Sequence, residues 1–198
     1  MTTRIIVPHR GLEDAKTRLA GVLEPTERAA LAERLLRHVL ATAMSTGHEV
    51  VVISPDPGLE PVVRATGATL SVQQGMGLNT GLRQARGEAL AAGVTLVAVL
   101  HGDLPDLAPS DVTALLAAAG DGLAVGIAPD AAGRGTNGLA LAPPDAVDFA
   151  FGPDSFAAHR AAGERAGATV TVVRRAGLAF DLDTPADLAA WLERGHAA

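Results

Sequence analysis

The segment 94–107, VTLVAVLHGDLPDL, restricts the fold of this chain more than any other stretch. It contains an uninterrupted apolar run, 96–100, and such runs are typical of strands that are buried on both faces of a parallel sheet. Pro105 cannot continue a central strand because it has no N–H for the ladder. We therefore expect Asp103 just beyond the carboxyl end of a central strand, where open α/β sheets bind their ligands.

Two roles are open for the Asp103 carboxylate. It either caps the turn before a helix that begins near Pro109, or it holds a divalent metal ion over a phosphate. Gly102 would let the backbone approach a bound ligand closely. We expect His101 to be structural rather than catalytic.

The composition predicts one globular domain that spans residues 1–198. Hydrophobic residues make up 48% of the chain and charged residues 19%, which excludes a disordered chain. A net charge of −6 without a basic block argues against nucleic-acid binding, and no apolar run approaches the roughly 20 residues of a membrane helix. The absence of cysteine excludes disulfides, thiol nucleophiles and Cys-ligated zinc. A strand directly after the first residues leaves no room for a signal peptide, so we expect a cytoplasmic protein.

Strands and helices alternate along the chain. Besides the strand 96–100, we predict strands at 4–7, 50–53, 69–72, 123–128, 139–141 and 170–173. We predict helices at 25–45, 80–91 and 110–118 and a short helix that ends near 66. Two further helices are predicted to begin near 155 and near 185. This alternation predicts an α/β fold with a mostly parallel central sheet flanked by helices.

Lys16 is the only lysine among 16 basic residues, and the others are arginines. It lies with Arg10 and Arg18 in a polar loop, 9–19, that follows the first strand. Cations after a first parallel strand suit an anion, most simply a polyphosphate, although a solvated connection would have a similar composition. The position of the lone lysine favours phosphate binding.

The loop 73–79 follows the third strand and leads into the helix 80–91. Gly75 and Gly77 favour close approach of the backbone to a ligand, although many such loops are only tight turns. They fit neither a dinucleotide fingerprint nor a Walker loop, because they follow the third strand and no G-K-[ST] occurs. The loop is a weak indication of nucleotide binding.

Two loops in the second half of the chain combine small polar side chains with glycines. The loop 129–138 contains Thr136 and Asn137 and is suited to a small anion. Ser155 is predicted either to cap the helix that starts there or to bind a carboxylate beside free N–H groups. Neutral donors in both places suit a short acid better than a sugar phosphate.

Asp181 and Asp183 are predicted in a strand, where residues two apart point to the same face. Two like charges side by side repel unless a cation lies between them. Thr184 and Asp187 are predicted as the N-cap and the third position of the last helix. Together with Asp103 the pair supplies three carboxylates, for which an oxygen-liganded divalent ion, Mg²⁺, is the simplest partner.

Six motifs in a fixed order cover nearly the whole chain. They are VPHRGLEDAKTRLA (7–20), GLNTGLRQA (77–85), LHGDLP (100–105), GTNGL (135–139), FGPDSFAAH (151–159) and LAFDLDTPADL (178–188). Together they resemble the 2-phospho-L-lactate guanylyltransferase family of coenzyme F-420 biosynthesis, which has the single-domain, Rossmann-like GT-A nucleotidyltransferase fold. One position departs from the family, which has lysine where Arg10 stands.

The resemblance implies transfer of GMP from GTP to a small phosphorylated acid, with release of pyrophosphate and with Mg²⁺ as cofactor. The implied metal ligands are Asp103, Asp181 and Asp183, and the implied catalytic residues are Lys16 and Asp103. Acceptor binding is implied for Thr136, Gly152 and Ser155, and we add Asn137 from the same loop. We predict nucleotide binding for Pro8, Arg10, Lys16, Arg18, Gly75, Gly77 and Asn79.

Several alternatives stay open. The acceptor is phosphoenolpyruvate in bacterial members of the family and 2-phospholactate in archaeal ones, and some accept 3-phosphoglycerate; the arginine-rich composition, typical of GC-rich bacteria, favours phosphoenolpyruvate. A molybdopterin or sugar-phosphate nucleotidyltransferase would carry a glycine-rich loop that 9–19 lacks. A non-catalytic nucleotide-binding domain would have no reason to place two carboxylates opposite Asp103. The sequence does not show how guanine is selected. It also leaves the oligomeric state open, and a homo-oligomer is one of the alternatives.

Overall fold

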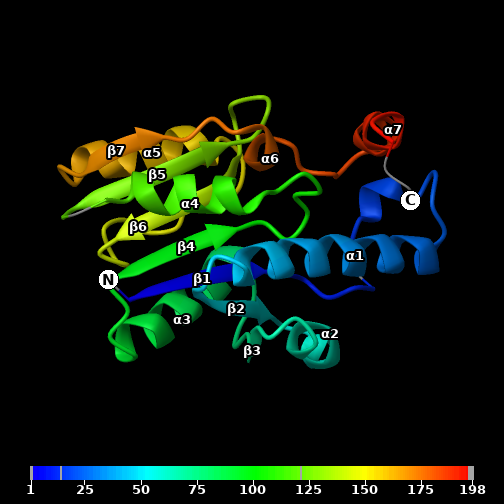
Figure 1. Cartoon of the computed structure of the whole chain (residues 1–198), viewed down its shortest axis with the longest axis horizontal. Helices are drawn as coiled ribbons and strands as arrows, with labels where there is room; N and C mark the ends of the chain where they lie inside the picture. The colour runs from blue at the N-terminus through cyan, green and yellow to red at the C-terminus, as the bar shows by residue number, and fades with distance from the viewer. Residues whose placement is uncertain (1, 14, 121, 196–198) are drawn as a thin grey trace.

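The computed structural model describes residues 2–13, 15–120 and 122–195. Within these residues seven strands form one sheet in the order β3-β2-β1-β4-β6-β5-β7 (Figure 1). Neighbouring strands are parallel except that β6 runs antiparallel to both β4 and β5. The strands are β1 (Thr3–Pro8), β2 (Glu49–Ser54), β3 (Thr69–Val72), β4 (Leu96–Leu100), β5 (Ala124–Pro129), β6 (Thr136–Ala142) and β7 (Thr169–Val172). Asp14, in the predicted phosphate loop, and both ends of the predicted 1–198 domain lie outside the described residues.

Helices cover both faces of the sheet. The helices are α1 (Pro25–Met44), α2 (Glu60–Arg64), α3 (Leu78–Ala91), α4 (Pro109–Ala118), α5 (Ser155–Arg165), α6 (Ala176–Ala179) and α7 (Pro185–Glu193). Apolar side chains of α1, α2 and α4 pack into one core cluster, and those of α3 and α5 pack into a second cluster on the opposite face. The predicted α/β class with a mostly parallel sheet is therefore confirmed.

The central strand β4 shows why an apolar run without alternation belongs in this fold. Leu96, Ala98 and Leu100 point into the first core cluster, whereas Val97 and Val99 point into the second. All five side chains are at most 4% exposed. Because side chains alternate between the faces of a strand, a strand with helices on both sides needs apolar residues at every position.

Strand β6 is longer than the predicted 139–141 and begins with the polar residues Thr136 and Asn137. Both are buried. Their side chains are accommodated because each has a hydrogen-bond partner, His159 for Thr136 and Asp181 for Asn137. The partners come from distant parts of the chain, so local sequence did not indicate that the strand starts this early.

Two predicted local structures are wrong. Asp181 and Asp183 lie in an extended connection between α6 and α7, not in a strand; Leu182 N–H donates to the Asp103 carbonyl at 3.1 Å. Ser155 is not an N-cap, because it is the first residue of α5 and follows Asp154, whose φ is 55°. The alternation predicted from the strand still holds in part, since Leu182 is buried and the two aspartates flank it.

The last helix begins as predicted. Thr184 is the N-cap of α7, its hydroxyl accepts from Asp187 N–H at 3.3 Å, and the Asp187 carboxylate accepts from Thr184 N–H at 2.7 Å. Leu188 and Trp191 then pack with residues of α1 and with Leu19 in a third cluster. This cluster places α7 beside the start of α1 (Figure 1) and anchors the segment 181–183.

No helix within the described residues is long and apolar enough to cross a membrane.

Candidate active site

The candidate active site lies at one edge of the sheet. The parallel strands β1, β4 and β5 all end at this edge, at Pro8, Leu100 and Pro129. Because β6 is antiparallel, it begins there, and His101 N–H donates to the Asn137 carbonyl at 3.1 Å. Residues from the loop after β1, the loop after β4, the start of β6 and the segment before α7 therefore meet at this edge.

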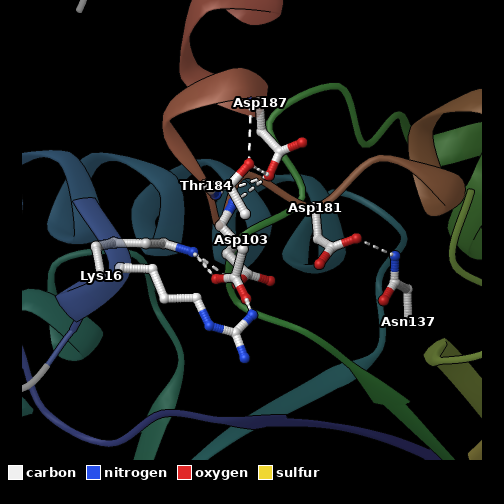
Figure 2. A network of polar contacts seen from close by, with 8 residues as sticks. Lys16, Asp103, Asn137, Asp181, Thr184 and Asp187 are labelled. Carbon is white, nitrogen blue, oxygen red and sulfur yellow. Dashed lines mark hydrogen bonds and ion pairs between the residues drawn. The ribbon is translucent and has the colours of Figure 1, made fainter. Parts of the chain in front are cut away.

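Lys16 contacts two of the predicted metal ligands, Asp103 and Asp183, and Figure 2 shows its side chain reaching Asp103. Its ammonium donates to Asp103 Oδ2 at 2.7 Å and to Asp183 Oδ1 at 3.1 Å. The lysine side chain is only 6% exposed, and its backbone has a φ of 54°, in the left-handed region. Asp103 and Asp183 are 87 and 167 positions from Lys16 in sequence. Because of this separation, the sequence showed no lysine near the carboxylates.

The charges of this group stabilise one another. Burial opposes the charge on Lys16, but the carboxylates of Asp103 and Asp183 outweigh it, so the pKa of Lys16 is raised. Burial likewise opposes the charge on Asp103, and Lys16 holds the pKa of that carboxyl below its usual value. Both groups are therefore ionised at neutral pH.

Asp181 faces the other side of the group and accepts from Asn137 Nδ2 at 3.1 Å (Figure 2). Burial raises the pKa of Asp181, the hydrogen bond from Asn137 opposes this, and the negative charges of Asp103 and Asp183 add to it. Asp103 Oδ1 is buried without a hydrogen-bond partner among the described residues. The described residues contain no group of three His, Cys, Asp or Glu side chains that is arranged to hold a metal ion, and Lys16 occupies the position between Asp103 and Asp183.

The other groups of the loop after β1 differ in charge and exposure. Arg10 and Arg18 are exposed, and Arg18 Nη1 contacts Asp183 Oδ2 at 3.2 Å. Pro8 ends β1. His9 accepts from Gly11 N–H through Nδ1, and burial lowers its pKa to about 4. His9 is therefore neutral at pH 7, and the cations of this loop are the lysine and the two arginines.

The glycine loop before α3 is stabilised by hydrogen bonds from one of its own side chains. Gly75 and Gly77 have φ values of 94° and 92°, and the Gln73 side chain donates to both of their carbonyls. Asn79, predicted to bind nucleotide, exchanges two hydrogen bonds of 2.9 Å with the backbone of Phe151. Asn79 therefore connects this loop to the predicted acceptor loop.

The predicted acceptor residues come from β6 and from the start of α5. Thr136 and Ser155 are each 2% exposed, and Phe156 N–H donates to the Arg134 carbonyl at 3.0 Å, which joins α5 to the loop before β6. Gly152 has a φ of 139°, a conformation that residues with a Cβ rarely adopt. The structure thus joins the start of α5 to the loop before β6, and Asn137 of β6 in turn contacts Asp181.

The residue that sequence reasoning missed is His159. It is fully buried, and its ring contacts both Thr136 and the backbone of Ala150. Its only signal in the sequence was its place at the end of the motif 151–159. A buried histidine that bridges two predicted acceptor loops was not evident, because those loops meet only in the folded chain.

Asp103 does not cap α4. Its Oδ2 accepts from Lys16, and its Oδ1 has no hydrogen-bond partner among the described residues. At the start of α4 the Ala108 N–H donates to Asp111 instead, at 3.0 Å. The metal-binding role of Asp103 stays a prediction.

The close approach of a ligand to the Gly102 backbone stays a prediction. Gly102 is buried, and a Cβ there would meet Leu36 at 3.3 Å, so the glycine allows close packing within the protein. His101 packs against Phe151, with ring centroids 5.5 Å apart.

Comparison with known proteins identifies the family of this fold and site. The family model described as "Guanylyl transferase CofC like" matches residues 3–197. The chain belongs to this guanylyltransferase family. The predicted family and the prediction that the chain is a nucleotidyltransferase are thereby confirmed.

Curated relatives of this guanylyltransferase cover nearly its whole length. A protein of Rubrobacter xylanophilus named "Phosphoenolpyruvate guanylyltransferase" is 44% identical over 190 residues, which are 96% of this chain and 93% of the relative. A protein of Sphaerobacter thermophilus with the same name is 44% identical over 191 residues, 95% of this chain and 91% of the relative.

Solved structures show the same fold at lower identity. One, from Desulfovibrio desulfuricans G20, is provisionally described as a nucleotide-diphospho-sugar transferase; it has a TM-score of 0.82 at 20% identity, over 100% of this chain and 90% of its own. A CMP:2-keto-3-deoxy-manno-octonic acid synthetase has a TM-score of 0.65 at 17% identity, over 99% of this chain and 100% of its own. These likenesses support the predicted GT-A type of nucleotidyltransferase fold.

Proposed function

We propose that this guanylyltransferase transfers GMP from GTP to phosphoenolpyruvate and releases pyrophosphate, as a step in coenzyme F-420 biosynthesis. The observation that carries the proposal is the 44% identity, over nearly the whole chain, to relatives named phosphoenolpyruvate guanylyltransferase. A phosphate oxygen of the acid attacks the α-phosphorus of GTP, and the bond to the β-phosphate breaks. The attacking oxygen is already anionic, so the reaction needs no general base.

The cations of the loop after β1 support binding of the triphosphate there. Lys16 is held charged by Asp103 and Asp183, and Arg18 and Arg10 extend the positive charge to the surface of the same loop. A GTP triphosphate at this edge would compete with the carboxylates for the ammonium. Two polyanions react only when their charge is neutralised and their groups are held in line, and this loop supplies part of both.

The three carboxylates have the donor chemistry that a magnesium ion needs, although the described residues do not arrange them around one metal position and Lys16 lies between two of them. Asp103 Oδ1 is a buried oxygen without a partner among the described residues, and the Asp181 carboxylate lies under the influence of two other negative charges. Asp103, Asp181 and Asp183 would hold the ion through oxygen atoms, the ligands that Mg²⁺ prefers. When bound, it would neutralise charge on the phosphates.

The acceptor pocket uses neutral groups. Thr136 and Asn137 at the start of β6, with Gly152 and Ser155 near the start of α5, provide hydroxyl, amide and backbone donors. Such donors would hold a carboxylate while the phosphate of the same molecule points to the charged group. A short acid with one carboxylate and one phosphate fits this division.

The test is an assay of pyrophosphate release with Mg²⁺. Purified protein is incubated with each of GTP, ATP, CTP and UTP, and with phosphoenolpyruvate, 2-phospholactate or 3-phosphoglycerate. We expect turnover with GTP and phosphoenolpyruvate, and a new diphosphate signal in the ³¹P NMR spectrum of the product. Pyrophosphate release without an acid, or a preference of more than about tenfold for another acid, would contradict the proposed acceptor.

A further inference from the structure

His159 is a buried imidazole with a defined partner at each ring nitrogen. It lies on α5 and is 0% exposed. Ala150 N–H donates to Nε2 at 2.9 Å, and Nδ1 lies 3.1 Å from Thr136 Oγ1. The ring therefore connects the start of β6 to the segment before Gly152, the two parts of the chain that are proposed to bind the acceptor.

These contacts determine the tautomer. A backbone N–H can only donate, so Nε2 is an acceptor and carries no proton. Burial, with a smaller contribution from His101, lowers the pKa of His159 to about 4, so the ring is neutral at pH 7. The ring proton of the neutral form must then be on Nδ1, where it faces the Thr136 hydroxyl.

The tautomer also determines the direction of the next hydrogen bond. Because Nδ1–H donates, Thr136 Oγ1 accepts from it, and the hydroxyl proton of Thr136 is left to donate elsewhere. The described residues include no other hydrogen-bond partner for this hydroxyl. A threonine fixed in this way keeps one hydroxyl proton for a further hydrogen bond.

The surroundings keep the imidazole in place. Phe151 packs edge-on against it, with ring centroids 4.8 Å apart. The Phe151 backbone is held by both hydrogen bonds to Asn79 at the start of α3. The donor direction of Thr136 is thus supported by α3, α5 and the segment between β6 and α5.

We propose that His159 is a positioning residue that keeps the Thr136 hydroxyl as a hydrogen-bond donor to an anionic oxygen of the acceptor acid. A donor fixed in this direction favours an oxyanion over a sugar hydroxyl, because a hydrogen bond to an ionised acceptor is stronger than one to a neutral hydroxyl oxygen. This inference rests on the proposed function, because it concerns how that function's acceptor is recognised.

The first test measures the tautomer directly in the folded wild-type protein. Long-range ¹H–¹⁵N NMR correlations of ¹⁵N-labelled histidine distinguish a protonated Nδ1 from a protonated Nε2. We expect His159 to show a protonated Nδ1 and an unprotonated Nε2 at pH 7, with assignment through a His159→Asn sample. A protonated Nε2 or a doubly protonated ring would overturn the inference, and this result does not depend on catalytic activity.

The second test is a double-mutant cycle on the KM for phosphoenolpyruvate. His159→Phe and Thr136→Val should each raise this KM roughly tenfold, as expected for a lost hydrogen bond to a charged group, with the KM for GTP changed less than about twofold. If His159 acts through Thr136, the double variant should be no more than about twofold worse than Thr136→Val alone. A purely structural histidine would instead give additive effects, which would overturn the inference.

Conservative variants separate positioning from general disruption. His159→Asn places an amide donor near Nδ1 and should retain more acid affinity than His159→Phe, and Thr136→Ser should retain more than Thr136→Val. His48→Asn is the matched control, because His48 precedes β2 at the opposite edge of the sheet. Thermal unfolding shows whether each variant is folded.

Equal losses of affinity for the acid in His159→Asn and His159→Phe would contradict the inference. A wild type without turnover on any acid would contradict the proposed function and the inference with it.

Discussion

The charged side of the site (Lys16, Asp103, Asp181 and Asp183) and the neutral side (Thr136, Ser155 and His159) bind their proposed ligands by different means. On the charged side, a lysine and two carboxylates pair at 2.7 and 3.1 Å. On the neutral side, a histidine without charge at pH 7 orients a hydroxyl. Buried charges are stable in the folded chain only when they are paired, whereas neutral donors need only hydrogen-bond partners.

This difference suggests that the two sides bind different parts of the substrates. The triphosphate carries most of the charge of the two substrates, and it is proposed to meet the side whose cation is held in the charged form. The carboxylate of the acid is small and is proposed to meet donors whose direction is fixed. Changes on the charged side should therefore affect catalysis, and changes on the neutral side should affect the affinity for the acid.

The largest expected effect is that of Asp103→Asn. The change keeps the shape of the side chain but removes the negative charge next to Lys16 and the proposed metal, so kcat should fall by about 100-fold or more. Steady-state assays at saturating Mg²⁺ measure it, and circular dichroism shows that the fold is retained. Asp148→Asn, which breaks a surface contact with Arg83, is the matched control. Near wild-type turnover of Asp103→Asn would exclude a role in catalysis.

Lys16→Ala should lower GTP binding or turnover by at least about tenfold, which corresponds to roughly 1.4 kcal/mol. The reason is the loss of the only lysine, which lies between two carboxylates at the sheet edge. Lys16→Arg should not restore activity, because a planar guanidinium and a compact ammonium bind differently. The measurement is kcat and the KM for GTP, and unchanged values in Lys16→Ala would mean that the loop is only a solvated connection.

Thr136→Val and Ser155→Ala test the neutral side. Each should raise the KM for phosphoenolpyruvate by roughly tenfold while the KM for GTP changes less than about twofold, because each removes one donor to the acid. Both constants are measured with the other substrate saturating. If the two variants instead weaken GTP binding and leave the KM for the acid unchanged, Thr136 and Ser155 belong to the GTP site and the proposed acceptor site is wrong.

The smallest expected effect concerns stability against pH. The pKa of His159 falls from 6.5 to about 4 on burial, so the unfolded chain binds a proton in this pH range that the folded chain does not. The stability that the neutral ring provides is complete above pH 6.5 and is lost as the pH falls towards about 4, by up to about 1.4 kcal/mol per pH unit.

Urea unfolding at several pH values measures this dependence. The slope of the free energy of unfolding against pH should be lower in His159→Asn than in the wild type, while His48→Asn should leave it unchanged. Equal slopes in all three proteins would show that His159 is not held neutral by burial.

Local sequence predicted much of the fold because the relevant forces act over a few residues. The uninterrupted apolar run 96–100 required a strand covered on both faces, and β4 is such a strand. Thr184 and Asp187 required a helix start, and α7 begins there with both hydrogen bonds in place. Lys16, the lone lysine in a loop after the first strand, contacts Asp103 and Asp183, and its role in phosphate binding stays a prediction.

One error came from partners that are distant in sequence. The extended segment with Asp181 and Asp183 resembles a strand in its alternation, yet it lies between α6 and α7. Among the described residues, its backbone bonds to the loop after β4 through the Leu182 N–H. The local alternation was correct, but the segments around it in space decided that it is not a strand of the sheet.

The sequence by itself determined the α/β class, the position of Asp103 at a strand end, and the family to which the chain belongs. Only the tertiary structure decided that β6 is antiparallel, which brings its first residue, Thr136, to the same edge as Asp103. It also placed Lys16 between Asp103 and Asp183, and His159 against Thr136. Apolar periodicity and helix capping depend on neighbours within a few residues, whereas ion pairs and the direction of a buried hydrogen bond depend on which distant segments the packed sheet brings together.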